Sequence, residues 1–378
     1  MKLQELLDIK RLDWLRDNRF VSMQSHPSLP LRIYNYTHVA QYDSKIWGDG
    51  TIDHCRGLIV DDENNIVSRP FMKFWNLNTI FVPESQEANL PKTTPTITEK
   101  LDGSLGILWR YRSEYGVASR GSFTSPQAQW ATNWLNEGID KQILSIPPDG
   151  SPYTWLFEII YDANRIVLKY SKEELVLLAR IDKETGAECN HEVTREVGIR
   201  HGFSVARQIR NKNIHDLLQE NKKNEEGYVV TYSRGDNAPP LKVKIKFEDY
   251  CRIHKVVTDM NPRSVWEILK SGKGVAEIVE GYPDHFGKWV RHWEGKLLQQ
   301  YADLQRTIYG IYNERPEVFD NGDTRQYRKD CALYFQSFNR PELTGAFFLL
   351  LDGKDPSEKL WDLIEPRGDD KSFREGDE

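Results

Sequence analysis

The sequence predicts an α+β protein in which antiparallel sheets with flanking helices precede an all-helical region. Short strand-like segments bounded by turn residues follow one another up to about residue 255. From about Val256 the apolar residues recur at helical spacing instead. The final residues are charged and lack apolar anchors. We therefore expect a mixed domain over 1–255, a helical domain over 256–366 and a disordered tail over 367–378.

The composition indicates a folded protein without a global attraction to nucleic acid. Of the 378 residues, 39% are hydrophobic and 11% aromatic, and the formal net charge is −6. Binding of nucleic acid would therefore depend on local basic patches. The four widely spaced cysteines form neither a disulfide framework nor a zinc pattern, and no apolar segment is long enough to span a membrane. We expect a cytoplasmic monomer that does not associate with a membrane.

The first elements of the mixed domain are a helix and a group of short strands. An amphipathic helix is expected over 1–20, where Leu and Trp recur at helical spacing. Strands are predicted at Leu31–Tyr34, Arg56–Val60 and Ile66–Ser68, and the last two would form a hairpin. The segment Arg69–Asn76 mixes cations with aromatic rings. Such a segment can bind phosphate and stack a base, or it can form a cluster at the edge of the core.

Further strands continue through the rest of this domain. They are predicted at Leu105–Leu108, Tyr115–Ser122, Tyr153–Ile160, Asn164–Leu168, Leu175–Ala179 and Tyr228–Val230. A helix is expected over Gln127–Glu137, and the segment 191–221 is expected to be helical at both ends. The clearest alternation lies in Leu241–Phe247, with apolar residues on one face and three lysines on the other. Like charges on one face indicate an exposed edge strand, or a polyanion bound against them.

The helical domain shows repeated apolar spacing and one clear helix start. Asn261 and Pro262 have the residue types that begin a helix. Helices are predicted at Arg263–Lys270, Val275–Val279, Phe286–Gly310, Arg325–Phe338 and Leu343–Leu351.

The segment Glu99–Ser104 carries the most specific chemical signal. A strand end would hold Lys100, and Asp102 with Gly103 would supply a tight turn. A lysine is a nucleophile only when it is neutral, so burial or nearby positive charge must lower its pKa. The same pattern also occurs in hairpin turns with a solvated lysine, so it needs support from the rest of the chain. Glu158, a carboxylate within an apolar strand, would contact a cation or metal, or point outward.

Five short motifs follow one another in an order that resembles the covalent nucleotidyltransferases, which include polynucleotide ligases and mRNA capping enzymes. They are Lys100–Gly103, Ser119–Gly121, Phe157–Glu158, Glu226–Val229 and Lys244–Lys246. Each match is weak alone, whereas all of them in order are a strong signal.

Within that superfamily the chain resembles most the RNA ligase 1 family of bacteriophages, over residues of about 30 to 255. The segments that carry this resemblance are Cys55–Gly57, Ser68–Pro70, Lys73–Phe74, Asn76–Asn78, Lys100–Ser104, Asn164–Leu168 and Glu226–Tyr228. One departure is Arg120, where the phage type usually has lysine. The substitution keeps the charge but changes its geometry.

The resemblance implies an adenylation domain of the nucleotidyltransferase (ATP-grasp-like) fold, followed by helices, and an ATP-dependent RNA ligase. Lys100 would attack the ATP α-phosphate, carry AMP and pass it to an RNA 5′-phosphate, which a 3′-hydroxyl would then attack. Lys244, Lys246 and Asp102 would share the catalysis, and Glu158 and Glu226 would hold Mg²⁺ or Mn²⁺. The residues that the family would use to bind ATP are Arg56, Lys73, Glu99, Lys100, Gly103, Arg120, Glu158, Glu226, Lys244 and Lys246.

Three other functions compete with this one. A GTP-dependent capping guanylyltransferase would carry an OB-fold after the fifth motif, where helices are predicted here. A DNA ligase would have arginine at the position of Leu105. A non-catalytic RNA- or nucleotide-binding module would not need the intact motif residues. The chain shows no P-loop motif, so we expect RNA with ready-made ends, a separate kinase and phosphatase for end healing, and a role in RNA (tRNA) repair.

Overall fold

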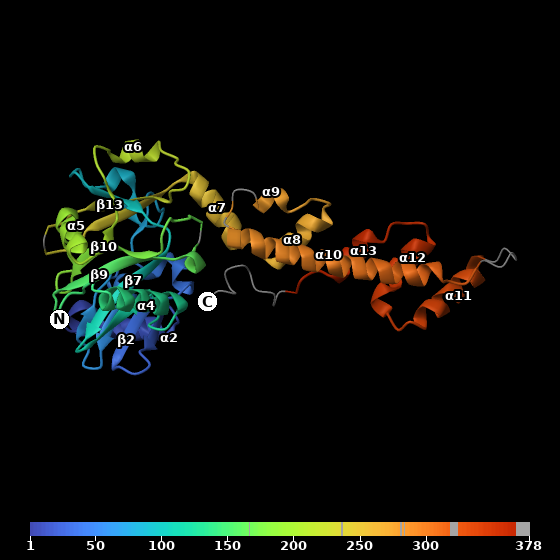
Figure 1. Ribbon diagram of the computed structural model, residues 1–378, viewed down its shortest axis with the longest axis horizontal. Helices are drawn as coiled ribbons and strands as arrows, with labels where there is room; N and C mark the ends of the chain where they lie inside the picture. The colour runs from blue at the N-terminus through green and yellow to red at the C-terminus, as the bar shows by residue number, and fades with distance from the viewer. Residues whose placement is uncertain (166, 236, 280–281, 283, 318–323, 368–378) are drawn as a thin grey trace. The chain divides into compact units, whose positions relative to one another are not determined.

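The computed structural model of the chain divides into two compact units, Met1–His254 and a second unit that begins at Lys255. The structure describes residues 1–165, 167–235, 237–279, 282, 284–317 and 324–367. The first unit combines sheets with surrounding helices, whereas the elements of the second unit are helices (Figure 1). The predicted α+β class with a helical C-terminal region is therefore confirmed. The predicted tail lies, from residue 368 onward, outside the described residues.

The first sheet has four antiparallel strands in chain order: β1 (Val21–Ser25), β2 (Leu31–Tyr36), β3 (Arg56–Asp61) and β4 (Ile66–Ser68). The predicted hairpin of β3 and β4 is confirmed. Two helices, α1 (Leu3–Leu6) and α2 (Ile9–Asp17), replace the single helix expected over 1–20. They are separate because the side chain of Asp8 caps α2, accepting a hydrogen bond from the Arg11 backbone N–H. A short helix, α3 (Thr51–His54), leads into β3.

The second sheet has five strands in the order β11-β10-β9-β7-β8. Their bounds are β7 Ser104–Tyr111, β8 Glu114–Ala118, β9 Tyr153–Ile160, β10 Glu174–Asp182 and β11 Ser204–Val205. Helices α4 (Pro126–Asp140) and α5 (His191–Arg200) pack against this sheet. A shared core of buried residues, which includes Ile33, Ile59 and Ile107, joins the first sheet to the second.

The third sheet has five strands in the order β12-β6-β13-β14-β5. Their bounds are β5 Trp75–Asn76, β6 Thr96–Lys100, β12 Gln208–Ile209, β13 Gly227–Tyr232 and β14 Leu241–Lys246. The expectation of an exposed edge at β14 is wrong, because β14 pairs with β13 on one side and with β5 on the other. Its apolar residues Val243 and Ile245 are buried in the core of this sheet.

The strand predicted at Asn164–Leu168 is also wrong. A 3-10 helix, η5 (Asp162–Asn164), is followed by a loop, and Ile166 lies outside the described residues. Val167 and Leu168 are buried but belong to no strand. Their backbone N–H groups donate to the Asp102 carboxylate in place of a neighbouring strand. An apolar run can therefore satisfy its backbone with a side chain as well as with a strand. The helices predicted at both ends of 191–221 are confirmed by α5 and by α6 (Ile214–Leu218).

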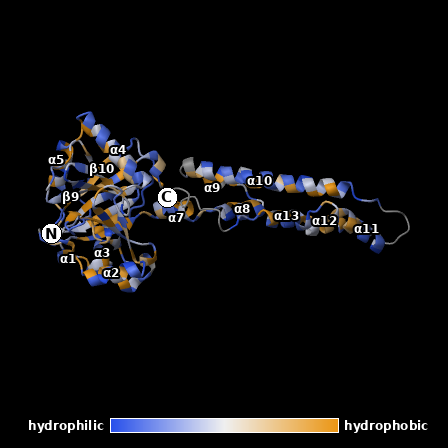
Figure 2. Cartoon of the chain, turned by 90° about the horizontal axis from the view of Figure 1, so that it is seen from below, coloured by the Kyte–Doolittle hydropathy of each residue, from blue (hydrophilic) through white to orange (hydrophobic). Residues whose placement is uncertain are grey.

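The second unit is built on one long helix, α10 (Asp284–Asn313), along which hydrophobic and hydrophilic residues alternate (Figure 2). The other helices here are α8 (Pro262–Lys270), α9 (Ala276–Val279), α11 (Thr324–Gln336), α12 (Thr344–Leu351) and α13 (Ser357–Leu363). Asn261 caps α8 as expected, accepting a hydrogen bond from the backbone N–H of Ser264. Helix α7 (Glu248–Asp259) includes the last residues of the first unit and the first residues of the second.

A hydrophobic core joins α10 to α11, α12 and α13, and it includes Ile308, Phe335, Phe347 and Leu360. Short 3-10 helices complete the chain at Val39–Tyr42, Ser44–Ile46, Pro83–Ser85, Glu87–Asn89 and Pro341–Leu343. Among the described residues, no helix is both long and apolar enough to cross a membrane.

Candidate active site

Lys100 lies at the junction of two sheets. It ends β6 in the third sheet, and residues 101–103 carry the chain to β7 in the second sheet. The alternative of a hairpin turn with a solvated lysine is therefore wrong, since β6 and β7 do not pair and Lys100 is only partly exposed. In the third sheet, Gly227 pairs with Lys100 on one side and with Lys246 on the other. Sheet register thus brings the first and fifth motifs together.

Glu226 is held between two lysines. Its Oε2 lies 2.7 Å from Nζ of Lys100, and its Oε1 lies 2.9 Å from Nζ of Lys246. The Glu226 side chain is only 2% exposed. A carboxylate buried to this degree needs such partners, because an unpaired buried charge is costly.

Lys244 lies on the same face of β14 as Lys246. Among the described residues it has no carboxylate partner. Burial, together with the positive charges of Lys100, Lys73, Lys246 and Arg56, lowers the pKa of Lys244 to about 7. A cation held close to other cations is ready to receive an anion. By contrast, Lys242 on the same strand forms an ion pair with Glu188 and lies over the Phe71 ring.

Glu158 extends from β9 toward Lys100 and Gly103. Burial raises the pKa of Glu158 to about 8; Lys100 opposes this rise, while Glu226 and Asp102 add to it. Gly103 is required beside it, because a Cβ there would lie 2.5 Å from the Ile159 carbonyl oxygen and 3.1 Å from Glu158 Cγ. The carboxyl group thus lies buried inside the site, close to both cations and carboxylates.

Asp102 organises the loop after Lys100. Its Oδ2 accepts hydrogen bonds from the backbone N–H groups of Val167 and Leu168 at 2.8 and 2.9 Å. The Tyr250 hydroxyl donates to its Oδ1 at 2.7 Å, and its own backbone N–H donates to the Tyr170 hydroxyl at 2.7 Å. With both oxygens engaged and the residue only 4% exposed, Asp102 ties this loop to residues far away in the sequence.

A second group of cations, which we call the phosphate cluster, consists of Arg56, Lys73 and Arg120 around the Tyr36 hydroxyl. Lys73 Nζ and Arg120 Nη1 donate to Tyr36 Oη at 3.3 and 3.2 Å. Burial raises the pKa of Tyr36, but the three cations outweigh it and lower the value to about 8. Nη1 of Arg56 is buried and has no hydrogen-bond partner in the part of the chain that the structure describes. Since buried donors are normally satisfied, this orphaned group indicates a ligand.

Phe74 connects the phosphate cluster with the lysines of β14. The Arg56 guanidinium carbon lies 5.2 Å from the centre of its ring, and Lys244 Nζ lies 6.0 Å from the same centre. Glu99, in contrast, is bound elsewhere: its Oε1 accepts from the Arg207 backbone N–H at 2.7 Å, and its Oε2 lies 3.2 Å from Arg207 Nε. Neighbouring residues of a strand point to opposite faces, so Glu99 and Lys100 diverge.

The carboxylates of the site suit a divalent cation that is shared with a ligand. Among the described residues no cluster of three or more His, Cys, Asp or Glu side chains is arranged to hold a metal by itself. Glu158 and Glu226 face the same site, and burial together with the charge of Glu226 raises the pKa of Glu158. Two carboxylates with phosphate oxygens and water match the way Mg²⁺ is bound in nucleotide sites.

Two tyrosines of this site were not identified from the sequence. The Tyr36 hydroxyl accepts hydrogen bonds from Lys73 and Arg120 of the phosphate cluster. The Tyr250 hydroxyl donates to Asp102, and the centre of the Tyr250 ring lies 5.0 Å from Lys246 Nζ. The predicted alternation ends at Tyr34, two residues before Tyr36, and such a pattern indicates burial, not contacts. Tyr250 lies on helix α7, and no local pattern relates it to Asp102.

The chain is similar in sequence to known RNA ligases. A family model described as RNA ligase matches residues 54–250, more than half of the chain. A protein of Thermovibrio ammonificans named as an RNA ligase is 27% identical over 253 residues, covering 66% of this chain and 64% of its own length. The RNA ligase of Rhodothermus phage RM378 is 22% identical over 368 residues, covering 79% and 81%. The chain thus spans less than two thirds of the Thermovibrio protein.

Among solved structures, an archaeal ATP-dependent RNA ligase aligns with 88% of this chain and 78% of its own, with a TM-score of 0.45 and 15% identity.

Proposed function

Because the chain belongs to the RNA ligase family, we propose that it joins RNA 5′-phosphate and 3′-hydroxyl ends in an ATP-dependent reaction. This membership agrees with the family that the motifs resemble. The observation that carries the proposal is the meeting of Lys100, Lys244, Lys246 and Glu226 beside the phosphate cluster. One potential nucleophile, surrounded by cations and paired carboxylates, fits transfer of a nucleotidyl group.

In the first step Lys100 Nζ attacks the α-phosphorus of ATP, and the bond to pyrophosphate breaks. The product is a phosphoramide bond between Lys100 and AMP. The attack requires a neutral amine. Glu226, now hydrogen-bonded to Lys100, holds the amine in place before ATP binds.

Two groups of cations bind different phosphates of ATP. Lys244 and Lys246 neutralise the α-phosphate, and the phosphate cluster of Arg56, Lys73 and Arg120 binds the β- and γ-phosphates. The orphaned Nη1 of Arg56 supplies a donor for this purpose. Glu158 and Glu226 would hold Mg²⁺ or Mn²⁺, which would supply charge neutralisation at the phosphates.

Three other residues support the reaction in distinct ways. Asp102 positions the loop that bears the nucleophile, as its four hydrogen bonds imply. Gly103 allows the backbone to approach Glu158 and the nucleotide. Glu99, through its contacts with Arg207, acts on nucleotide binding by positioning the strand that ends in Lys100.

In the later steps the AMP passes to the 5′-phosphate of one RNA strand, and a 3′-hydroxyl then displaces it. We propose that the enzyme works in the cytoplasm as a monomer on ends prepared by a separate kinase and phosphatase, in repair of RNA such as tRNA. If the pure protein alone sealed a 5′-hydroxyl end, this division of labour would be disproved.

Labelling with radioactive nucleotide tests the proposed function. The pure protein is incubated with Mg²⁺ and α-labelled ATP or GTP, denatured and separated on a gel. We expect label from ATP on the protein, with lower stability in acid than in alkali, and none on Lys100→Ala. Lys141→Ala, which alters an exposed lysine paired with Glu137, is the matched control and should label normally.

Other outcomes of the same experiment select the rival functions. Label from GTP in place of ATP would identify a capping guanylyltransferase. A folded protein that takes no label from either nucleotide would be a binding module without catalytic activity.

A further inference from the structure

A cavity of about 610 Å³ lies in the first unit beside the segment Arg69–Trp75. Its volume is in the range of sites that bind small molecules or single groups of a larger ligand. Five aromatic side chains contribute to its lining: Trp47, Phe71, Phe74, Trp75 and Phe81. Lys100, Glu158 and Glu226 do not line it, so it is a separate compartment from the reaction centre.

The aromatic wall has one ring that is open to solvent. Trp75 packs edge-to-face on Trp47, with centroids 5.0 Å apart, and on Phe81, with centroids 4.9 Å apart. Phe81 nevertheless remains 42% exposed. An exposed ring supported by partly buried aromatic neighbours is a platform on which a base can stack.

The charge of the cavity lining favours an anionic ligand. Lys73, Arg69, Arg234 and Lys242 line it, against the carboxylates of Asp53 and Glu84. Both carboxylates are already engaged: Asp53 accepts hydrogen bonds from the backbone N–H groups of Gly48 and Gly50, and Glu84 pairs with Arg234. Lys242 is likewise paired, with Glu188, so within the described residues Lys73 and Arg69 are the lining cations that form no ion pair. Their two charges exceed the one charge of Asp53 in a cavity with aromatic walls, as in sites for single-stranded nucleic acid.

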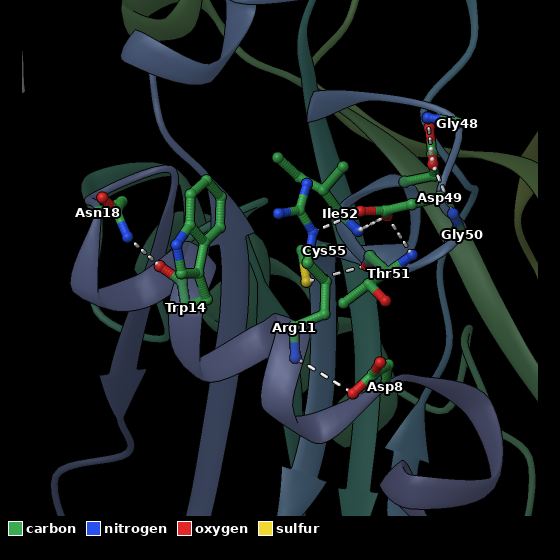
Figure 3. Close-up of polar contacts among 11 residues, drawn as sticks. Asp8, Arg11, Trp14, Asn18, Gly48, Asp49, Gly50, Thr51, Ile52 and Cys55 are labelled. Atoms are coloured by element: carbon green, nitrogen blue, oxygen red, sulfur yellow. Dashed lines mark hydrogen bonds and ion pairs between the residues drawn. The ribbon is translucent and has the colours of Figure 1, made fainter. Parts of the chain in front are cut away.

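One side of the cavity is fixed before any ligand binds. Gly48 and Gly50 belong to this side, and Asp49 between them accepts hydrogen bonds from the backbone N–H groups of Thr51 and Ile52 (Figure 3). Arg11 of α2 donates its Nε to the same carboxylate at 2.6 Å (Figure 3). Such a fixed wall reduces the entropy lost on binding.

Lys73 joins the cavity to the phosphate cluster. It lines the cavity, and its Nζ also donates to Tyr36 Oη within the cluster. Phe74 likewise lines the cavity and lies between Arg56 and Lys244. In space, the order from the reaction centre outward is therefore Lys244, Phe74, Lys73 and then the cavity.

The geometry of phosphoryl transfer indicates what lies beyond the phosphate cluster. Attack on phosphorus is in line with the leaving group, so pyrophosphate departs on the side opposite Lys100. In the next step Lys100 is the leaving group, and the RNA 5′-phosphate must enter on the side that pyrophosphate left. The P–N bond to Lys100 breaks as the new P–O bond forms, and the lysine takes up a proton. The entering RNA phosphate thus occupies the phosphate cluster.

We propose that this cavity binds the 5′-terminal nucleotide of the RNA strand that receives AMP, with its base against the aromatic wall of Phe81. This inference rests on the proposed function, because it requires an RNA 5′-phosphate at the phosphate cluster. The adenine of ATP lies at the opposite end of the site, since ATP extends from the phosphate cluster through the α-phosphate at Lys244 and away from the cavity.

The test isolates the second step of the reaction. Wild-type protein is loaded with labelled AMP, freed of ATP and mixed with a 5′-phosphorylated RNA or with the same RNA lacking its first base. The rate of label transfer is then measured against RNA concentration. We expect the missing base to lower the efficiency of transfer by roughly tenfold. Phe81→Ala should transfer roughly tenfold less efficiently to the intact RNA and show no preference between the two RNAs.

Two controls accompany this measurement. Loading of Phe81→Ala with AMP should equal that of the wild type, which also shows that the variant is folded. Trp14→Ala removes another exposed aromatic ring of the first unit, one that lies outside the cavity, and should keep the wild-type preference for the intact RNA.

Three results would overturn the proposal. The first is that the wild type transfers AMP equally well to the intact RNA and to the RNA lacking its first base. The second is that Phe81→Ala lowers the transfer efficiency by the same factor for both RNAs. A raised KM for ATP in the loading step of Phe81→Ala would assign the cavity to adenine. If the wild type failed to load AMP at all, the proposed function itself would fail, and this would be seen before RNA is added.

Discussion

Tyr36 has a strong effect on the cations around it although it carries no charge at neutral pH. Its hydroxyl is the common acceptor for Lys73 and Arg120, and its ring lies against both, with the cationic groups 4.8 and 5.0 Å from its centroid. Without this tyrosine the cations would repel one another with nothing between them. A single buried phenol therefore keeps the phosphate cluster in order while leaving its charge available.

The lowered pKa of Tyr36 makes a prediction about stability and pH. The pKa is about 8 in the folded chain and about 10 for an ordinary tyrosine. Between these values the folded state has lost the proton and the unfolded state keeps it, so stability rises with pH. The added stability, at most about 3 kcal/mol, is complete above about pH 10 and is lost as the pH falls through about 8.

Denaturant unfolding from pH 7 to pH 10 measures this effect as the difference between wild type and Tyr36→Phe. The difference should grow in favour of the wild type as the pH rises. Tyr34→Phe, which also alters a buried tyrosine of β2, controls for the loss of a hydroxyl group. A difference that stays constant with pH would show that Tyr36 does not ionise in this range.

At the scale of elements, three adjacent strands build the catalytic row. Strands β6, β13 and β14 bring Lys100, Gly227 and Lys246 into register, and Glu226 precedes Gly227 at the start of β13. Gly227 has a φ of +144°, and a Cβ there would lie 2.0 Å from the Ile245 carbonyl oxygen. The row therefore depends on the absence of a side chain at one position.

Gly227→Ala should displace β14 from β13 and destabilise the protein by about 2 to 4 kcal/mol. The yield of lysyl-AMP should also fall, since Lys246 would move away from Glu226. Gly295→Ala is the matched control: this glycine lies in α10, and a Cβ added to it would meet nothing within 4 Å. That change should stabilise the helix by roughly 0.5 to 1 kcal/mol. Equal unfolding free energies for the two variants would contradict the argument.

At the scale of the whole molecule, the proposed chemistry belongs to the first compact unit. Every residue assigned to ATP, metal or catalysis lies within Met1–His254. The second unit has its own core, built from α10 to α13. We infer that it contributes to the choice of RNA and not to the formation of lysyl-AMP.

Truncation after Asp259, at the end of α7, separates these two roles. The shortened chain should form lysyl-AMP from ATP to the same extent as the full chain, whereas joining of RNA ends should decrease or change its preference among RNAs. Labelling with ATP and a joining assay on several RNAs measure both. A truncated protein that folds but takes up no AMP would show that the helical unit is needed for the first step.

The sequence by itself determined the local elements and the family. Period-two alternation located β2 and β14, apolar runs located β3 and β9, and period-3.6 spacing located the C-terminal helices, because all of these signals depend on neighbouring residues. The five motifs, through their order along the chain, indicated the nucleotidyltransferase superfamily, and further short segments indicated the RNA ligase family within it. Local pattern failed where long-range contacts decided the outcome, as at Val167 and Leu168, which donate to Asp102 in place of forming a strand.

Only the tertiary structure decided how the site residues meet. Glu226 lies between Lys100 and Lys246 because of strand register, and Lys244 and Glu158 acquire shifted pKa values because of burial and neighbouring charges. Tyr36 of β2 and Tyr250 of α7 contact residues of the site, although no local sequence pattern indicated this. The physical reason is that side-chain charge, burial and hydrogen bonding depend on neighbours in space, and those neighbours are distant in the sequence.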